Sequence, residues 1–436
     1  MKQVEIITIG DELLIGQVVD TNSAWIATRL NEWGFEVMQI TSVHDDAAQI
    51  RQALSEAERR ADVVLLTGGL GPTKDDITKH TLCEYFDTTL TYRPEIREHL
   101  EQLYSSRPDV LNRLTDTQCL FPENATLIWN RVGSAQVMAW SRQPSSLSPH
   151  TSHIISMPGV PYEMMWCMNH GVGELLRSLT EDAGTIVHRT IQVYGIPESS
   201  LALKIEKWED ALPAGMHLAY LPKDGIIRLR LSGYGVRPEE VDTEIQKLLP
   251  LIQEYLFATE DQPVEVLVGE LLKQRGQTIA TAESCTGGKL AMLLNRHAGS
   301  SAFYRGSVVS YANDVKTSVL HVQPFDDAVT EQVVLQMADG VRTLMRTDYA
   351  IATSGVAGPE EATRLVASSS SAAGADSART QNYSEHPVGT VWIAIATPQG
   401  TQARRFQLGK LREQITDRAA TAALIWLIRE LRACNP

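Results

Sequence analysis

Short apolar and β-branched runs alternate with stretches of helical spacing in the first and last thirds of the chain. In the first third, the runs "VEIITIG" and "ADVVLLT" predict buried strands, and the amphipathic stretches between such runs predict helices. The last third repeats this order with "DYAIATSG", "GTVWIAIAT" and a final helix over 411–432. Such alternation is typical of a mostly parallel sheet with helices on both faces. The pattern therefore predicts an α/β protein with two doubly wound, mostly parallel-sheet domains.

The pattern changes between residues 185 and 258, where a strand, a helix, a second strand and a longer helix follow one another. This order predicts a small α+β domain that could suit a KH-like RNA-binding module. No GxxG occurs in this range, however, and KH modules use that loop to clamp a nucleic-acid backbone. We therefore expect a KH-like spacer or oligomerisation domain that joins the other two. The predicted domains are 1–178, 185–258 and 264–436, with "ATEDQP" (258–263) as a linker.

One segment of the last domain, residues 360–386, breaks the alternation. Its Ser/Ala bias provides too little apolar surface to fix a structure. Loops of this length inside a compact domain are usually functional or disordered. We expect this insertion to be disordered.

Composition and charge narrow the function. The chain has 436 residues, of which 43% are hydrophobic and 21% charged, and its formal net charge is −14. This balance argues against general nucleic-acid or membrane-surface binding, because both need a cationic face. The five cysteines are scattered, with no C-x-x-C spacing, which is typical of reduced thiols. With no signal-peptide or membrane-helix pattern in the sequence, we expect a cytoplasmic protein that binds neither nucleic acid nor membrane.

The stretch "TIATAESCTGGKLA" (278–291) places three candidate nucleophiles, Ser284, Cys285 and Thr286, between a strand and a helix. Free amides at a helix start bind phosphate or stabilise an oxyanion, and Gly287 and Gly288 permit close approach of a ligand. Alternatively, Ser284 or Thr286 is only the helix N-cap. Cys285 could be the nucleophile instead, but because it is next to Ser284 on a tight turn we expect it to face elsewhere, as a small buried hydrophobe. We favour Ser284 over Cys285 as the nucleophile.

An activated serine needs a base or a cation within reach. The next strand ends in "GSVVSYANDVK", which supplies Tyr311 and Lys316, whereas the nearby histidines have no comparable setting. Ligands of α/β sheets bind at the carboxyl ends of strands. By this rule the loop "TSGVAGP" (353–359), with Ser354 and Gly355, opens onto the same edge. Arg412, at the start of the final helix, is either an anion clamp or an ordinary surface arginine.

The same logic applies to "TGGLGPTKDDIT" (67–78) in the first domain. Its three glycines and its proline form a backbone nest suited to phosphate, or its adjacent carboxylates bind a hard divalent cation that carries the phosphate. Alternatively, it is a turn followed by acidic residues at a helix start. Asp45 and Asp46 add carboxylates at another strand end. The candidate ligand-loop residues are Gly68, Gly69, Gly71 and Thr73, and the candidate metal ligands are Asp75, Asp76 and Asp11.

Taken together and in this order, these motifs resemble the CinA family over nearly the whole chain. The stretches that carry the resemblance are "GDELLIGQVVDTN", "TGGLGPTKDDIT", "MPGVPYEM", "AESCTGG", "GSVVSYANDVK", "SGVAGP" and "PVGTVWIA". The resemblance implies a first domain with a molybdopterin-binding-protein-like fold and metal-dependent ADP-ribose pyrophosphatase activity. It also implies a KH-like middle domain.

For the last domain, the resemblance implies an amidohydrolase that converts nicotinamide mononucleotide to nicotinate mononucleotide and ammonia without a cofactor. Ser284 matches the family nucleophile, Tyr311 and Lys316 match its partners, and Arg412 matches an arginine that starts the last helix. The candidate substrate-binding residues are Thr286–Gly288, Ser354 and Gly355. A small-molecule nucleotide substrate and a homodimer are expected.

Two alternatives stay open at this point. In the first, only the N-terminal domain is active, as a metal-dependent nucleotide pyrophosphatase. In the second, both loop sets bind a pterin or nucleotide without turnover, as the fold alone permits. The stretch "GSAQVM" (133–138) departs from the family by losing a proline and a glycine from a site loop. This departure puts the N-terminal activity in doubt more than the N-terminal fold.

Overall fold

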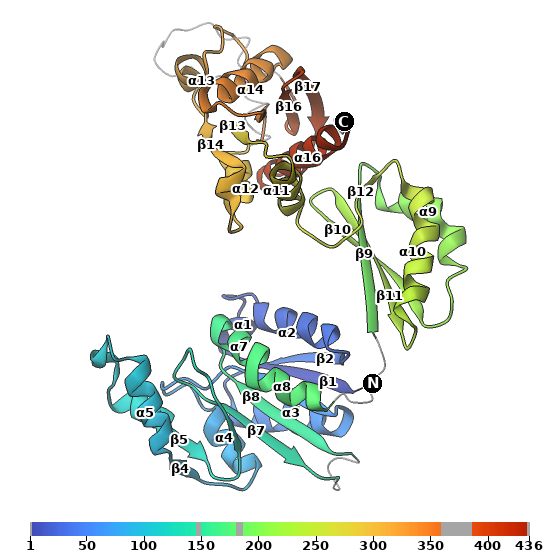
Figure 1. The fold of residues 1–436 in the computed structure, drawn as a ribbon. Helices are drawn as coiled ribbons and strands as arrows, with labels where there is room; N and C mark the ends of the chain where they lie inside the picture. The colour runs from blue at the N-terminus through green and yellow to red at the C-terminus, as the bar shows by residue number, and fades with distance from the viewer. Residues whose placement is uncertain (1, 145–149, 180–185, 359–385, 434–436) are drawn as a thin grey trace, which may run out of the picture. The chain divides into compact units, whose positions relative to one another are not determined.

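The structure is a computed structural model that describes residues 2–144, 150–179, 186–358 and 386–433. The chain divides into two compact units (Figure 1). The first extends to Val187 and includes Gly233–Arg237, and the second holds the rest of the chain from His188. The insertion predicted to be disordered, 360–386, lies outside the described residues except for its last position.

The first unit is built on a six-stranded sheet of order β2-β1-β3-β8-β7-β6, in which β2, β1, β3 and β8 pair in parallel. β7 pairs antiparallel with both β8 and β6. The strands are β1 (Gln3–Ile9), β2 (Glu36–Val43), β3 (Val63–Thr67), β6 (Thr126–Ile128), β7 (Val137–Arg142) and β8 (Ser152–Met157), with β4 (Leu90–Tyr92) and β5 (Leu120–Pro122) in a separate pair.

Two apolar cores lie on the two faces of this sheet, because side chains of successive strand residues point to opposite faces. Ile6 and Leu65 pack with α2 and α7, whereas Ile7 and Leu66 pack with α3 and α4. The helices are α1 (Asp11–Leu14), α2 (Thr21–Glu32), α3 (Ala47–Arg60), α4 (Thr78–Tyr85), α5 (Pro94–Leu103), α6 (Arg113–Asp116), α7 (Pro161–Cys167) and α8 (Gly173–Ser178), with short turns at Pro108–Val110, Thr117–Cys119 and Met168–Val172.

The second unit begins with a four-stranded sheet of order β10-β11-β9-β12 that carries two helices. These elements are β9 (Ile186–Tyr194), α9 (Glu198–Glu209), β10 (Met216–Lys223), β11 (Ile226–Tyr234), α10 (Pro238–Ile252) and β12 (Leu256–Ala258). The predicted linker after β12 is held in place, because the Gln192 side-chain amide donates to the carbonyls of Glu260 and Gln262, at 2.9 and 2.7 Å.

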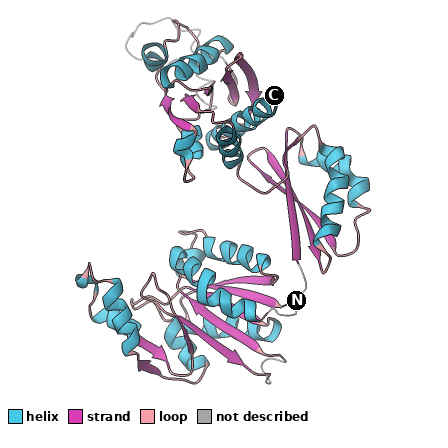
Figure 2. Cartoon of the chain, viewed as in Figure 1, coloured by secondary structure: helices cyan, strands magenta, loops and turns pink. Residues whose placement is uncertain are grey.

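The rest of this unit is a five-stranded sheet of order β14-β13-β15-β16-β17, drawn as strands in Figure 2. β13 pairs in parallel with β14 and β15, and β16 pairs antiparallel with both β15 and β17. The elements are α11 (Val264–Gln274), β13 (Ile279–Glu283), α12 (Lys289–Asn295), a short turn at Ser300–Ala302, β14 (Tyr304–Val309), α13 (Asn313–Leu320), α14 (Glu331–Met345), β15 (Tyr349–Gly355), β16 (Thr390–Thr397), β17 (Gly400–Gln407) and α16 (Arg412–Ala433).

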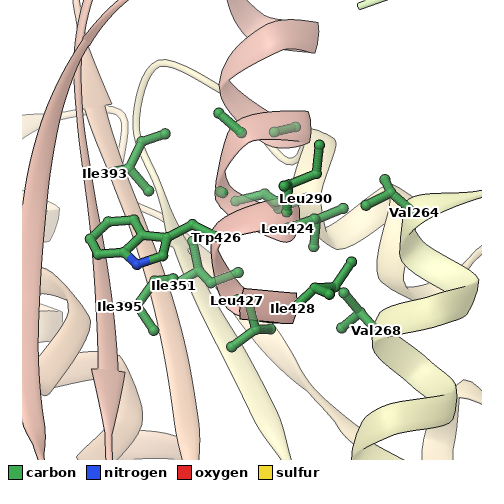
Figure 3. Packing of buried hydrophobic residues seen from close by; sticks show 14 of the residues in the cluster. Val264, Val268, Leu290, Ile351, Ile393, Ile395, Leu424, Trp426, Leu427 and Ile428 are labelled. Atoms are coloured by element: carbon green, nitrogen blue, oxygen red, sulfur yellow. The ribbon is translucent and has the colours of Figure 1, made fainter. Parts of the chain in front are cut away.

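Helices cover both faces of this sheet, and the alternation of β13 decides which residues meet which helices. Ile279 belongs to the core with α11, α12 and α16, whose packing around Trp426 is seen in Figure 3. Ala280 and Ala282 belong to the other core, with α14 and the end of α13. The odd-numbered and even-numbered positions of β13 therefore face different helices.

The predicted fold class, with two α/β sheets and a small α+β sheet between them in chain order, is confirmed. The sequence pattern missed eight strands of the structure, namely β4, β5, β6, β7, β8, β10, β12 and β17. None of the helices in the described ranges has the length and apolar character needed to cross a bilayer.

Candidate functional site

Ser284 follows the central strand β13 at the carboxyl edge of the C-terminal sheet. Its amide donates to the Thr353 carbonyl at 3.0 Å, which continues the ladder with β15. On the other side, the Ser310 amide donates to the Glu283 carbonyl at 2.8 Å. Because the alternation of β13 continues into Ser284, its half-buried side chain lies on the α13–α14 face of the sheet.

Cys285 takes the opposite direction. Its side chain is 6% exposed and belongs to the core that α11, α12 and α16 form. Burial raises the pKa of this thiol to about 12, so the thiolate needed for nucleophilic attack is scarce at neutral pH. The expectation that Cys285 is a small buried hydrophobe is confirmed.

The start of α12 is capped by a residue that sequence reasoning overlooked, Glu283. Its side chain is fully buried, and each of its oxygens accepts several hydrogen bonds. The donors are the amides of Gly288, Leu290 and Ala291, at 3.0, 3.0 and 2.8 Å, and the hydroxyls of Thr281, Thr286 and Ser307, at 3.3, 2.8 and 3.3 Å. Glu283 therefore occupies the helix start that was expected to hold the ligand.

This arrangement changes the roles predicted for the glycine loop. The Thr286 hydroxyl also bonds to Thr353 and is 5% exposed, so it holds the loop together and is not available to a substrate. Gly288 has φ +100°, a left-handed conformation that favours glycine, and its amide is taken by Glu283. Within the part of the chain that the structure describes, the amides of Cys285 and Thr286 donate to no backbone carbonyl.

Lys316 lies on α13, on the same face of the sheet as Ser284, and is 1% exposed. Its ammonium nitrogen Nζ donates to the Ser310 carbonyl at 2.7 Å, with the Tyr311 carbonyl and Asn313 Oδ1 farther away at 3.4 and 3.5 Å. Burial lowers the pKa of Lys316, and the nearby Cys285 and Asp314 oppose this shift only in part. A lysine in this state has a larger neutral fraction and can accept a proton.

Tyr311 and Arg412 form the rim of this edge. The Tyr311 side chain is 61% exposed, and its hydroxyl oxygen accepts a hydrogen bond from Arg412 Nη2 at 2.9 Å. Arg412 Nη1 donates to the Gly358 carbonyl at 3.4 Å. The exposed guanidinium group of Arg412, at the start of α16, therefore contacts both the loop after β14 and the loop after β15. Such a group suits an anionic ligand.

The predicted substrate contacts Ser354 and Gly355 are placed differently. The Ser354 hydroxyl donates to the Ala328 carbonyl at 2.7 Å, and the residue is 1% exposed. A Cβ atom at Gly355 would lie 2.7 Å from the Thr390 carbonyl oxygen, so the glycine is needed for close packing of β15 on β16. The Ser354 hydroxyl is therefore engaged within the protein, and the role of both residues as substrate contacts stays a prediction.

In the N-terminal unit, the loop after β3 folds closely onto its neighbours. Gly68 has φ +116°, and a Cβ atom there would lie 2.1 Å from the Ile9 carbonyl oxygen. The Gly69 carbonyl accepts from the Thr78 amide at 3.2 Å. Asp76 accepts from the amides of Gly71 and Thr73, at 2.7 and 2.9 Å, and from the Thr73 hydroxyl. The amides of Gly71 and Thr73 and the carbonyl of Gly69 are therefore already hydrogen-bonded within this segment.

The carboxylates of this region gather without forming a metal site. Burial raises the pKa of Asp45, and the neighbouring carboxylates Asp11, Glu12 and Asp76 raise it further. Asp11 Oδ1 lies 2.8 Å from His44 Nδ1, and Asp75 is exposed. Within the described ranges, no three His, Cys, Asp or Glu side chains are placed to share one ion. The residues as placed do not fit a divalent metal, and we derive no step through one.

The altered stretch 133–138 borders a buried polar pair that sequence reasoning also missed. Asn130 Nδ2 donates to Glu163 Oε2 at 2.6 Å and to the Ala135 carbonyl at 3.0 Å. A Cβ atom at Gly133 would lie 1.8 Å from Glu163 Oε2. Burial raises the pKa of Glu163. The sequence did not indicate that Glu163 is buried, because glutamates are usually exposed.

Comparison with known proteins agrees with this architecture. Three family profiles match the chain: the probable molybdopterin binding domain over 5–178, the damage-inducible protein CinA KH domain over 188–259, and the CinA C-terminal domain over 261–369 and 366–431. A CinA-like protein of Flavobacterium psychrophilum is 41% identical over 439 residues, and one of Cytophaga hutchinsonii is 41% identical over 437 residues. Each alignment covers 98% of both chains.

Among solved structures, competence damage-inducible protein A from Klebsiella pneumoniae is 31% identical, covering 39% of this chain and 97% of that one with a TM-score of 0.33. The full-length identity and the three consecutive domain matches decide the assignment. The chain belongs to the CinA family, with a KH-like domain between a molybdopterin-binding-like domain and a CinA C-terminal domain.

Proposed function

We propose that the C-terminal domain is a nicotinamide mononucleotide deamidase. The observation that carries this proposal is that Glu283, and not Ser284, caps α12 at this edge of the sheet. Ser284 therefore lies on the same face of the sheet as the buried Lys316 without a capping role. A serine hydroxyl on the same face of the sheet as a lysine of lowered pKa suits nucleophilic attack on an uncharged carboxamide. The exposed Arg412 at the rim suits a phosphate group.

The reaction would proceed through an acyl-enzyme. Ser284 Oγ attacks the carboxamide carbon while its proton passes toward neutral Lys316. The amides of Cys285 and Thr286 are candidates to stabilise the oxyanion, since the amide that follows a nucleophile often does so. The proton then goes to the departing nitrogen, which leaves as ammonia. Water attacks the acyl-enzyme and releases nicotinate mononucleotide, with no cofactor involved.

The predicted N-terminal activity receives less support. A metal-dependent ADP-ribose pyrophosphatase stays a prediction, because the candidate ligands Asp11, Asp75 and Asp76 do not converge on one ion. The shared negative charge around Asp45 is the one feature that favours a cationic ligand there. The expected homodimer and cytoplasmic location also stay predictions.

The first test is ammonia release from nicotinamide mononucleotide by the purified full chain in the presence of EDTA. We expect steady turnover, because no step of the proposed reaction needs a metal. Nicotinamide riboside, which lacks the phosphate, serves as the matched substrate and should react more slowly. No ammonia, together with thermal stabilisation by the nucleotide, would indicate a binding module and contradict the proposal.

The lowered pKa of Lys316 predicts how the rate depends on pH. A neutral amine is the proton acceptor, and its fraction increases as pH rises through its pKa. We therefore expect kcat/KM to rise with pH and to level off below the pH at which an ordinary lysine titrates. Substitution Lys316→Met should abolish this limb of the profile. A wild-type profile that falls between neutral and mildly alkaline pH would contradict the assignment of Lys316 as the base.

A further inference from the structure

Ser310 carries a buried hydroxyl that has no role in the proposed deamidation by Ser284 and Lys316. The residue is fully buried, and its Oγ atom has no hydrogen-bond partner in the described part of the chain. Buried hydroxyls are nearly always hydrogen-bonded, because leaving one unpaired costs about 1–3 kcal/mol. An unpaired hydroxyl beside a candidate active site therefore requires an explanation.

The sheet places this hydroxyl next to the nucleophile. In the parallel pair of β13 and β14, Glu283 is opposite Val309, so the next step of the register sets Ser284 opposite Ser310. The hydrogen bond from the Ser310 amide to the Glu283 carbonyl keeps this register at the strand ends. Neighbouring strands lie about 5 Å apart, which two serine side chains can bridge by rotation about one bond.

The two hydroxyls also lie on the same face. Ala280 and Ala282 pack in the α14 core, and Val308 packs against that core from β14. By alternation, Ser284 and Ser310 continue these two rows on the same side of the sheet. The hydrogen bonds that Ser284 makes to other described residues involve its backbone amide and carbonyl. The Ser310 hydroxyl can therefore pair with the hydroxyl of Ser284.

Lys316 approaches Ser310 from α13. Its Nζ atom binds the Ser310 carbonyl at 2.7 Å, which is the shortest of its three contacts. The amine is thus anchored on the backbone of the same residue whose side chain faces the nucleophile. The other candidate for this role, Tyr311, is 61% exposed and its hydroxyl is bound by Arg412 at the rim.

We propose that Ser310 is a positioning residue that relays the proton of Ser284 to Lys316 in the deamidase reaction proposed above. In the structure Ser310 Oγ is bonded to neither group, so the relay requires rotation of the Ser310 side chain to bring its Oγ between Ser284 Oγ and Lys316 Nζ. As Ser284 Oγ then forms its bond to the carboxamide carbon, its proton moves to Ser310 Oγ, and the Ser310 proton moves to the neutral Lys316 amine. The same chain returns one proton to the departing nitrogen when the carbon–nitrogen bond breaks. Ammonia leaves, and both Ser310 and Lys316 regain their starting states.

The test compares Ser310→Ala with Ser310→Thr, and uses Ser318→Ala as a matched control because Ser318 is exposed on α13. General acid–base groups contribute about 100-fold or more, so we expect Ser310→Ala to lower kcat by about that factor with little change in KM. The rise of kcat/KM with pH should disappear in this variant. Ser310→Thr keeps the hydroxyl and should recover most of the rate and the wild-type pH profile.

Stability separates this role from a structural one. Since Ser310 Oγ makes no hydrogen bond to the residues that the structure describes, its removal should leave Tm unchanged or raise it. An active wild type with an equally active Ser310→Ala variant would overturn the relay alone. A lower Tm that accounts for the lost rate would also overturn it. Absence of ammonia release in the wild type would overturn the deamidase proposal and the relay with it.

Discussion

Substitution Ser284→Ala is expected to reduce ammonia release from nicotinamide mononucleotide by at least about 1,000-fold, which corresponds to about 4 kcal/mol of transition-state stabilisation. The loss should appear in kcat, because the substitution removes the oxygen that forms the acyl-enzyme while the rim around Arg412 stays in place. Residual activity over water would come from the remaining binding and electrostatic groups. The measurement is single-turnover and steady-state ammonia release by the full chain.

Cys285→Ala is the control for this experiment, because the thiol is the neighbouring nucleophile and the substitution leaves the Cys285 amide in place. We expect it to keep most of the activity, since the side chain lies in the α11–α12–α16 core on the other face of the sheet. Thermal unfolding of both variants shows whether either lost its fold. Full activity in Ser284→Ala, or an inactive but folded Cys285→Ala, would contradict the assignment of the nucleophile.

Much of the fold could be predicted from local pattern, and the misses have physical reasons. Buried strands such as β3, β13 and β15 are rich in apolar residues, which the sequence displays directly. The missed strand β17 is an edge strand with mostly exposed positions and two consecutive arginines. β12 has only three residues. Edge and short strands depend on pairing with the neighbouring strand, which a local pattern does not display.

The candidate site could be predicted as a set of loops but not as a set of contacts. The rule for strand ends placed Ser284, Tyr311 and Lys316 at one edge, and the structure brings the loops that carry them together. The rule for strand ends did not distinguish residues that could contact a ligand from residues that stabilise a loop. Thr286 and Ser354 have the same chemistry as Ser284, yet their hydroxyls are bound to buried protein groups.

The N-terminal carboxylates illustrate the same limit. Sequence position put Asp11, Asp45 and Asp76 at neighbouring strand ends, and the raised pKa of Asp45 agrees that their charges interact. A metal site needs a defined coordination geometry in addition to proximity. Asp76 instead binds the amides of its own loop, a local arrangement that competes with metal binding and that spacing alone does not reveal.

Substitution Glu283→Ala is expected to lower the free energy of unfolding of the C-terminal domain by more than about 3 kcal/mol, because it leaves several buried donors without an acceptor. The amides of Gly288, Leu290 and Ala291 should lose their protection, so hydrogen exchange of the peptide that spans α12 should accelerate. The midpoint of urea unfolding should fall at the same time. Glu270→Ala serves as the control, since Glu270 is an exposed glutamate on α11.

This experiment also tests why Ser284 is free to react. A serine before a helix usually caps it, and that role would tie its hydroxyl to a backbone amide. Here the buried carboxylate of Glu283 takes the helix start, so the serine is left on the other side of the strand. Loss of Glu283 should therefore reduce ammonia release as well, because Ser284 becomes the nearest cap. Wild-type exchange in α12 of the Glu283→Ala variant would show that another group caps the helix and would remove this explanation.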